Sequence, residues 1–433
     1  MALLPVWLLW LSTAVYGQPA TNPTPAALNP TSLSLAQAQQ MAVERNWDLL
    51  GAAAGIDAAT AQKIVAREFP NPTLSLATSK INVDNHPNST AAGNGLWDRS
   101  YDTIFAINQL LEIGGKRASR KAVAQAGFEG TKAQFLDVKR LLDLGVTKAY
   151  AAAIQAEENV RVLQQSAATL RQEATIAETR LRAGEISASD KEQIDIAAER
   201  FELDARAAAF TAAQARIALE VLLGVPHPKG TLVLSDTLEN LSTAAMPAPV
   251  DEVPTWRPDV VAADAALRKA EADVRLQKAN RIPDPTLLAQ YEHEPPDNIN
   301  SVGFGVSFPL PLWNRNRGNI MVAQAAREQA RLALEKTKAQ AVADVATARL
   351  AYDDALRRWR SYRESIRPKS QQVRQTIAYA YQKGGASLLD LLIAERNDND
   401  IRLAATQAAN DLVMATVTLK AASLQMSPSQ LRK

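Results

Sequence analysis

The chain of 433 residues has no cysteine, only three histidines, 5% aromatic residues and no excess of either sign of charge. The absence of cysteine excludes disulfides, thiolate ligands, a cysteine nucleophile and a lipid attached to an N-terminal cysteine. His86, His227 and His293 do not have the spacing of metal ligands, so no metal site is expected. The 48 basic and 46 acidic residues nearly balance and are interleaved, which argues against nucleic acid as a partner.

Motifs of catalysis and cofactor binding are also missing. Gly114-Gly115-Lys116-Arg117 lacks the spacing of a phosphate-binding loop and is better explained as a turn between a strand and a helix. The acidic pair Asp353-Asp354 lies in a long helical pattern, where a solvated or lumen-facing surface explains it. We therefore expect a protein that is not an enzyme and that has no cofactor.

The start of the chain has the pattern of an export signal. An apolar run from Leu3 to Gly17 precedes a Pro/Thr/Asn-rich stretch, and Val15 and Gly17 occupy the positions expected before a cleavage site. We interpret residues 1–17 as a signal peptide, although the run lacks a preceding Lys or Arg and a short N-terminal anchor is the alternative. No other run predicts a membrane-spanning helix, so a membrane would have to be crossed by strands.

The same landmarks occur twice, about 200 residues apart. Pro70-Asn71-Pro72-Thr73-Leu74 returns as Pro283-Asp284-Pro285-Thr286-Leu287, and a Gly-x-x-Ser-x-x-Asp motif begins at both Gly184 and Gly384. Each half is predicted to be helix, strand, strand, long helix, helix, because the copies of a repeat share one supersecondary unit. The predicted segments are a signal peptide (1–17), a Pro-rich segment (18–31), a first repeat (32–225), a linker with a small side domain (226–254), a second repeat (255–427) and a tail (428–433).

The long helices are predicted from sustained heptads of small apolar residues. Pairs such as Leu142/Val146 and Ala149/Ala153 recur every seven residues, and alanine in such a seam lets neighbouring helices approach closely. One uninterrupted helix over about 118–183 would be about 100 Å long. A cytoskeletal or scaffold coiled coil would explain the heptads equally well, but not the export signal or the strands.

Strands are predicted in two pairs, at 73–82 with 101–110 and at 286–294 with 302–308. Val302, Phe304 and Val306 alternate with glycine and serine, so one face is apolar and the other is small or polar. The pattern fits a membrane hairpin or an edge hairpin of a soluble domain equally well. Four strands cannot close a membrane barrel, whose minimum is about eight, so a barrel would need two or three chains.

Taken together, the duplicated order, the paired Pro-x-Pro-Thr-Leu motifs, the Gly-x-x-Ser-x-x-Asp motifs and residues 111–117 (LEIGGKR) resemble the TolC-like outer-membrane efflux factors. Residues 308–318 (FPLPLWNRNRG) are similar to the heavy-metal cation efflux branch, the CzcC-like proteins. The resemblance implies a homotrimer with a twelve-stranded β-barrel in the outer membrane, continued by a long α-helical coiled-coil barrel in the periplasm. It also implies a periplasmic adaptor and a proton-driven inner-membrane pump as partners.

The resemblance further implies a periplasmic entrance near the two helix breaks. Asp190, Asp390 and Tyr381 match gating or selectivity positions of the family. The expected adaptor contacts are Gly184, Ser187, Gly384 and Ser387. Two positions depart from the family pattern, because Ala386 replaces an arginine and Ile393 replaces an aspartate, which puts the entrance lock in doubt. The alternative for both aspartates is that they only stabilise helix N-termini.

The expected function is a passive export duct for heavy-metal cations. A duct for drugs or secreted polypeptides remains open, because a duct need not bind what passes through it. A periplasmic structural coiled coil is the alternative outside transport.

Overall fold

The computed structural model describes residues 32–79, 102–244, 256–294 and 299–424. The predicted signal peptide (1–17), the Pro-rich segment (18–31), the tail (428–433) and the residues between the first two predicted strands (83–100) lie outside these residues. Among the described residues, no helix combines the length and the apolar character needed to span a membrane. The described elements are, in order, α1 (Leu35–Arg45), α2 (Trp47–Val65), β1 (Thr73–Thr78), β2 (Thr103–Leu110), α4 (Lys116–Arg182), α5 (Ala188–Leu222), α6 (Leu238–Ala244), α7 (Pro258–Ala279), β3 (Thr286–Glu294), β4 (Ile299–Ser307), α8 (Arg317–Ser361), the π-helix η1 (Tyr362–Ile366), α9 (Arg367–Gln382) and α10 (Leu388–Ser423).

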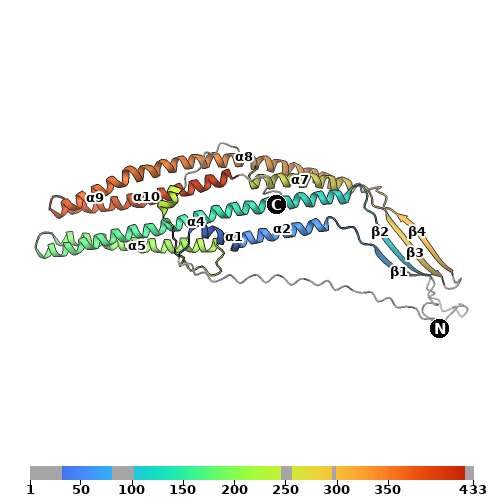
Figure 1. Ribbon diagram of the computed structural model, residues 1–433, viewed down its shortest axis with the longest axis horizontal. Coiled ribbons are helices and arrows are strands. Elements are labelled where there is room, and N and C mark those ends of the chain that lie inside the picture. Colours follow the sequence, from blue (N-terminus) through green and yellow to red (C-terminus); the bar gives the residue numbers. More distant parts are fainter. Residues whose placement is uncertain (1–31, 80–101, 245–255, 295–298, 425–433) are drawn as a thin grey trace, which may run out of the picture.

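The strands form one antiparallel sheet in the order β1-β2-β3-β4, at one end of the molecule (Figure 1). In its register Ile107 lies opposite both Leu74 and Ala289, and Ala289 lies opposite Phe304, so that these side chains share a face. The large side chains on this face are exposed: Leu74, Leu76, Phe105, Ile107, Leu287, Tyr291, Val302, Phe304 and Val306. Small and polar residues, such as Ser75, Gln290 and Gly303, lie on the other face. The alternation expected from the sequence is confirmed.

The long helices form a layer that runs away from the sheet (Figure 1). Contacts between helices give the lateral order α2 and α5, then α4, then α7 and α10, then α8, η1 and α9. The helices α2 and α5 follow end to end, because the Asn46 side chain caps α2 and also donates to the carbonyl of Leu222 at 3.0 Å. The strands β1, β2, β3 and β4 connect to α2, α4, α7 and α8, respectively. The helices therefore lie in the same order across the layer as the strands do across the sheet.

Alanine seams hold neighbouring helices together. In α5, Ala198, Ala205, Ala212 and Leu219 recur every seven residues and are at most 7% exposed. Small side chains at a seam allow close packing, and this contact confirms the heptads that predicted the helices.

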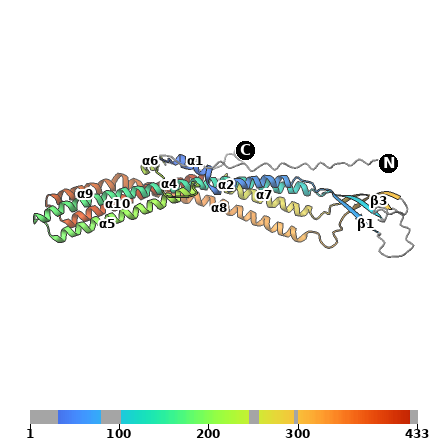
Figure 2. The same cartoon turned by 90° about the horizontal axis from the view of Figure 1, so that it is seen from below.

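Two short helices, α1 and α6, lie on one face of the layer near its middle (Figure 2). The segment before α1 is joined to the segment before α6 by the parallel bridge between Leu33 and Leu234. Beneath them, the hydroxyl of Tyr150 lies 2.7 Å from the carbonyl oxygen of Leu33 and 2.8 Å from the carboxylate of Asp236. Tyr150 is fully buried, so α4 provides the support for this attachment.

Two helices that the repeat pattern predicted as continuous are interrupted in the structure. The first helix of the first repeat is divided into α1 and α2, because Asn46 takes an extended conformation (φ −64°, ψ 126°) and its side chain accepts a hydrogen bond from the backbone of Leu49. In the second repeat the long helix contains a π-turn, in which the amide of Arg367 donates to the carbonyl of Tyr362. Pro368 follows directly and has no amide hydrogen to continue the α-helical pattern, which is the physical reason for the turn.

Candidate functional site

The two helix breaks form turns of the same geometry at the end of the molecule opposite the sheet (Figure 1). Gly184 and Gly384 have φ of +74° and +76°, in the left-handed region that glycine occupies without steric cost. In each turn the next residue, Glu185 or Gly385, donates its amide to a carbonyl five residues earlier. These bonds satisfy the free carbonyls at the ends of α4 and α9.

Ser187 and Ser387 begin the helices that follow. Each serine hydroxyl accepts a hydrogen bond from the amide three residues later, at 3.1 Å for Asp190 and 3.2 Å for Asp390. The two aspartates accept in return from the serine amides, at 3.3 and 3.1 Å. These are reciprocal capping boxes.

Asp190 and Asp390 thus have a defined local role at the starts of α5 and α10. Hydrogen bonds from the Ser387 hydroxyl and amide lower the pKa of Asp390, so its carboxylate stays charged in mildly acidic solution. Both side chains remain at the protein surface. The capping role that the sequence left open is present in both turns.

Tyr381 lies just before the second turn and is 8% exposed. Its ring is 5.3 Å from the guanidinium of Arg180, which also donates to the carbonyl of Gln382 at 3.0 Å. Sequence reasoning missed Arg180, because nothing in one sequence indicates that the end of α4 meets the end of α9. The side chain of Ala386 is partly exposed, and that of Ile393 is 49% exposed.

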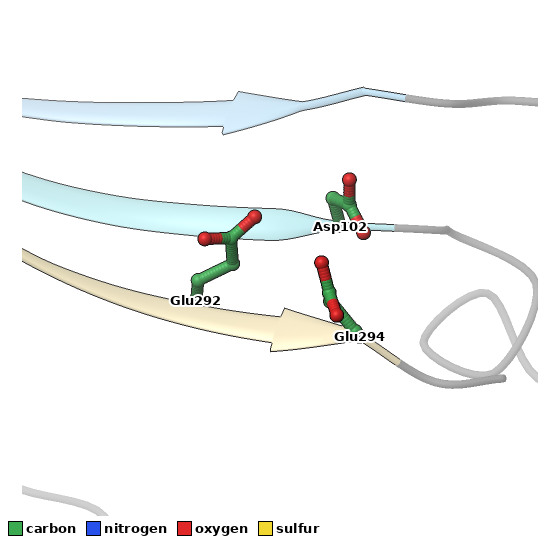
Figure 3. A group of neighbouring side chains, drawn as sticks. All are labelled: Asp102, Glu292 and Glu294. Carbon is green, nitrogen blue, oxygen red and sulfur yellow. The ribbon is translucent and has the colours of Figure 1, made fainter. Parts of the chain in front are cut away.

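A second group of charged residues lies on the sheet. Carboxylate oxygens of Asp102, Glu292 and Glu294 are all within 4.8 Å of one another (Figure 3). Asp102 precedes β2, whereas Glu292 and Glu294 lie two residues apart on β3 and therefore share a face. Glu292 is two residues from Gln290, which places the group on the polar face. The sequence did not predict that these three carboxylates lie together, because Asp102 and the glutamates belong to different repeats.

Because β2 leads to α4 and β3 follows α7, this carboxylate group lies at the end of the sheet that is farther from the helices. Asp102 is 4% exposed and has positive φ (+41°). A surface lined by carboxylates and backed by low-dielectric protein raises the local concentration of cations.

Known proteins with similar sequences identify the family of this chain. The family model described as outer membrane efflux protein matches residues 38–225 and 251–423, one segment for each half. The cobalt-zinc-cadmium resistance protein CzcC of Cupriavidus metallidurans is 25% identical over 371 residues, which cover 84% of this chain and 83% of that protein. The nickel-cobalt-cadmium resistance protein NccC of Alcaligenes xylosoxydans xylosoxydans is 24% identical over 325 residues, or 74% of this chain and 69% of that protein.

The fold is also found among solved structures. CusC, whose structures concern folding and transmembrane channel formation, has a TM-score of 0.76 at 20% identity, covering 94% of this chain and 98% of the CusC chain. This likeness confirms the fold expected from the sequence. Since the family model covers most of both repeats, the chain belongs to the outer membrane efflux protein family.

Proposed function

We propose that the protein is the passive outer-membrane duct of a tripartite efflux system and that it expels heavy-metal cations. The family supports export across the outer membrane, and the resistance proteins similar to this chain support metal cations as cargo. The duct itself performs no chemistry, because energy comes from a proton-driven inner-membrane pump joined to it by a periplasmic adaptor.

The two faces of the sheet support a place in the membrane. The face that carries Phe105, Val302 and Phe304 is apolar and exposed, as lipid contact requires, while the polar face lines the lumen. Among the described strands, β1 and β4 each pair on one side only. Unpaired backbone groups are costly in lipid, so these edges pair with other copies of the chain, and three copies give twelve strands.

The outer flank of α5 supports the same assembly. Ile196, Leu203, Phe210 and Ile217 recur every seven residues and are 38–65% exposed, on the side of α5 away from its buried alanine seam. A heptad stripe without a partner helix is the pattern of a coiled-coil contact still to be made. In the trimer this stripe packs against the α8 and α9 side of the next copy.

The helical turns form the periplasmic entrance in this proposal. Asp190 and Asp390 contribute six carboxylates to a trimer and attract cations there, and Tyr381 helps to close the entrance. Gly184, Ser187, Gly384 and Ser387 form the tips that meet the adaptor. At the other end, Asp102, Glu292 and Glu294 place negative charge at the outer mouth of the same lumen.

The observation that carries the proposal is negative charge at both ends of one polar path, in a chain similar to metal-resistance proteins. The test is a deletion of the gene in its host, complemented with the wild type or with a Glu292→Gln/Glu294→Gln variant. Tolerance to Co²⁺, Zn²⁺, Cd²⁺ and Ni²⁺ should fall on deletion and recover fully only with the wild type.

Tolerance to lipophilic drugs in the same strains is the control, and it should not change. Loss of drug tolerance with intact metal tolerance would instead identify a drug duct. The export function would be rejected if the deletion strain kept its tolerance to both metals and drugs and if the protein were absent from the outer-membrane fraction of the wild type.

A further inference from the structure

A pocket rich in arginine lies between α4, α9 and α10, in the half of the layer nearer the turns. It has a volume of about 230 Å³ and is lined by Gln165, Arg367, Gln371, Arg374, Asp398 and Arg402. Arg367 and Arg402 also line an adjoining hollow of about 320 Å³ that reaches α6. Through this hollow the pocket adjoins α6, which lies on one face of the layer.

The carboxylates near the pocket are already engaged by one of its arginines. Arg374 lies 3.0 Å from Glu395 and 3.3 Å from Asp398, and Asp398 also accepts a hydrogen bond from Ser370 at 2.8 Å. Both carboxylates are buried. They form a closed ionic group with Arg374, which leaves little negative charge for the other two guanidinium groups.

Arg367 and Arg402 are engaged differently from Arg374. Arg402 donates to the amide oxygen of Gln165 at 2.5 Å. Within the described part of the chain, neither arginine forms a salt bridge. Burial lowers the pKa of Arg402, and the positive charges of Arg367 and Arg374 add to that shift, whereas Asp398 and Glu158 oppose it. The pocket is therefore a partly buried site with excess positive charge.

The backbone supports the same assignment. Arg367 directly follows the π-turn of η1, and its own amide closes that turn on Tyr362. Single π-turns within α-helices are uncommon and are frequent at functional sites. Here the turn fixes the start of α9, from which Arg367, Gln371 and Arg374 reach the pocket.

We propose that this pocket binds a small oxyanion, a carboxylate or a phosphate, between Arg367 and Arg402. The planar guanidinium group donates parallel N–H bonds to both kinds of oxyanion, and Gln165 and Gln371 add neutral donors. The site is separate from the cation path described above. The choice of a soluble anion rests on the proposed membrane position of the sheet, because α9 lies at the end of the molecule opposite the sheet and therefore away from lipid headgroups (Figure 1).

The test is calorimetric titration of the purified full-length protein in detergent at constant ionic strength. Inorganic phosphate and citrate are titrated separately, and sodium chloride is the control for screening. Saturable binding of phosphate alone, or of citrate alone, identifies the anion class. Binding should weaken about tenfold or more in Arg367→Gln/Arg402→Gln, because charge-assisted hydrogen bonds are lost.

Two further variants control for folding and for net charge. Arg367 is exposed, so Arg367→Gln alone should fold normally and still weaken binding. Arg206→Gln removes one exposed charge from α5 and should leave binding unchanged. No saturable heat with either anion, or equal affinity in wild type and Arg367→Gln, would overturn the proposal.

Discussion

The guanidinium of Arg180 lies over the ring of Tyr381, at 5.3 Å from its centre, and this contact joins the end of α4 to the end of α9. Apolar contacts nearby also join the two hairpins, because Ile186 and Leu388, one from each hairpin, pack on the cluster of Ala174, Ala177 and Ile194. The two helical hairpins are therefore held together next to their turns by polar and apolar contacts.

Replacing Arg180 by Gln should loosen both turns. A cation–π contact at a partly exposed site contributes about 0.5–1 kcal/mol, so amide exchange in the two turns should accelerate about two- to fivefold. Hydrogen-exchange mass spectrometry of peptides covering 180–190 and 380–390 measures this. Tyr381→Phe keeps the ring and should exchange like the wild type. Equal acceleration in both variants would show that the ring contact with Arg180 is not what holds the turns.

The aspartates at the turns should serve cation selectivity separately from capping. Asp190→Asn/Asp390→Asn removes six charges from the proposed trimer, so the reversal potential under a salt gradient in planar bilayers should move toward zero. The shift should be larger at low salt, where the Debye length is about 30 Å. Ser187→Ala/Ser387→Ala is the matched control, because it removes the serine caps and keeps the charges. If the two double variants behave alike, the aspartates act only as helix starts.

Acidification should strengthen the contact between α4 and α10 near the turns. Burial and the charge of Glu395 raise the pKa of Glu173, despite opposing effects of Arg180 and Gln382. Because the folded state binds this proton more tightly than the unfolded state, stability rises as the pH falls through the raised pKa toward the ordinary value. Glu173→Gln should therefore slow amide hydrogen exchange of residues 170–182 at pH 7.5 and make the stability of this segment less dependent on pH. Glu192→Gln, a change at an exposed position, should alter neither the exchange rate nor its pH dependence.

The attachment of the N-terminal segment should depend on the hydroxyl of Tyr150. Burial and Asp236 raise the pKa of this phenol, so it stays protonated and available as a donor. Tyr150→Phe leaves the Leu33 carbonyl and Asp236 without that donor, at a cost of about 1–3 kcal/mol. Proteolysis within residues 32–46 should become faster. Tyr352→Phe is a suitable control, since within the described residues the Tyr352 hydroxyl makes no hydrogen bond. Similar cleavage rates in both variants would contradict this role.

The exposed stripe on α5 should be needed for assembly. Phe210→Asp places a charge where two chains would pack, so light scattering in detergent should find less trimer than in the wild type. Asp204→Asn, at another exposed position of α5, should assemble normally. A full trimer in Phe210→Asp would exclude this flank of α5 from the interface.

Local sequence patterns predicted most of the fold because the seams of α4 and α5 repeat every seven residues without interruption. The turns at Gly184 and Gly384 were equally visible, since glycine and a Ser-x-x-Asp capping box occur together. The break at Asn46 was missed although Asn46 is a typical helix N-cap, because the apolar pattern continues through it. Contacts such as Arg180 with Tyr381, or Asp102 with Glu292, join the two repeats, and no local spacing predicts which residues will meet across them.

The π-turn gives the two repeats different mechanics. In the first repeat, α4 runs for 67 residues without a break. Its counterpart in the second repeat consists of α8, η1 and α9, and only the 16 residues of α9 lie between η1 and the turn. Those 16 residues span about 24 Å, so a change of about 10° at η1 would carry the Gly384 turn sideways by about 4 Å. The second hairpin thus has a short lever arm near its free end, and the first has a rigid rod.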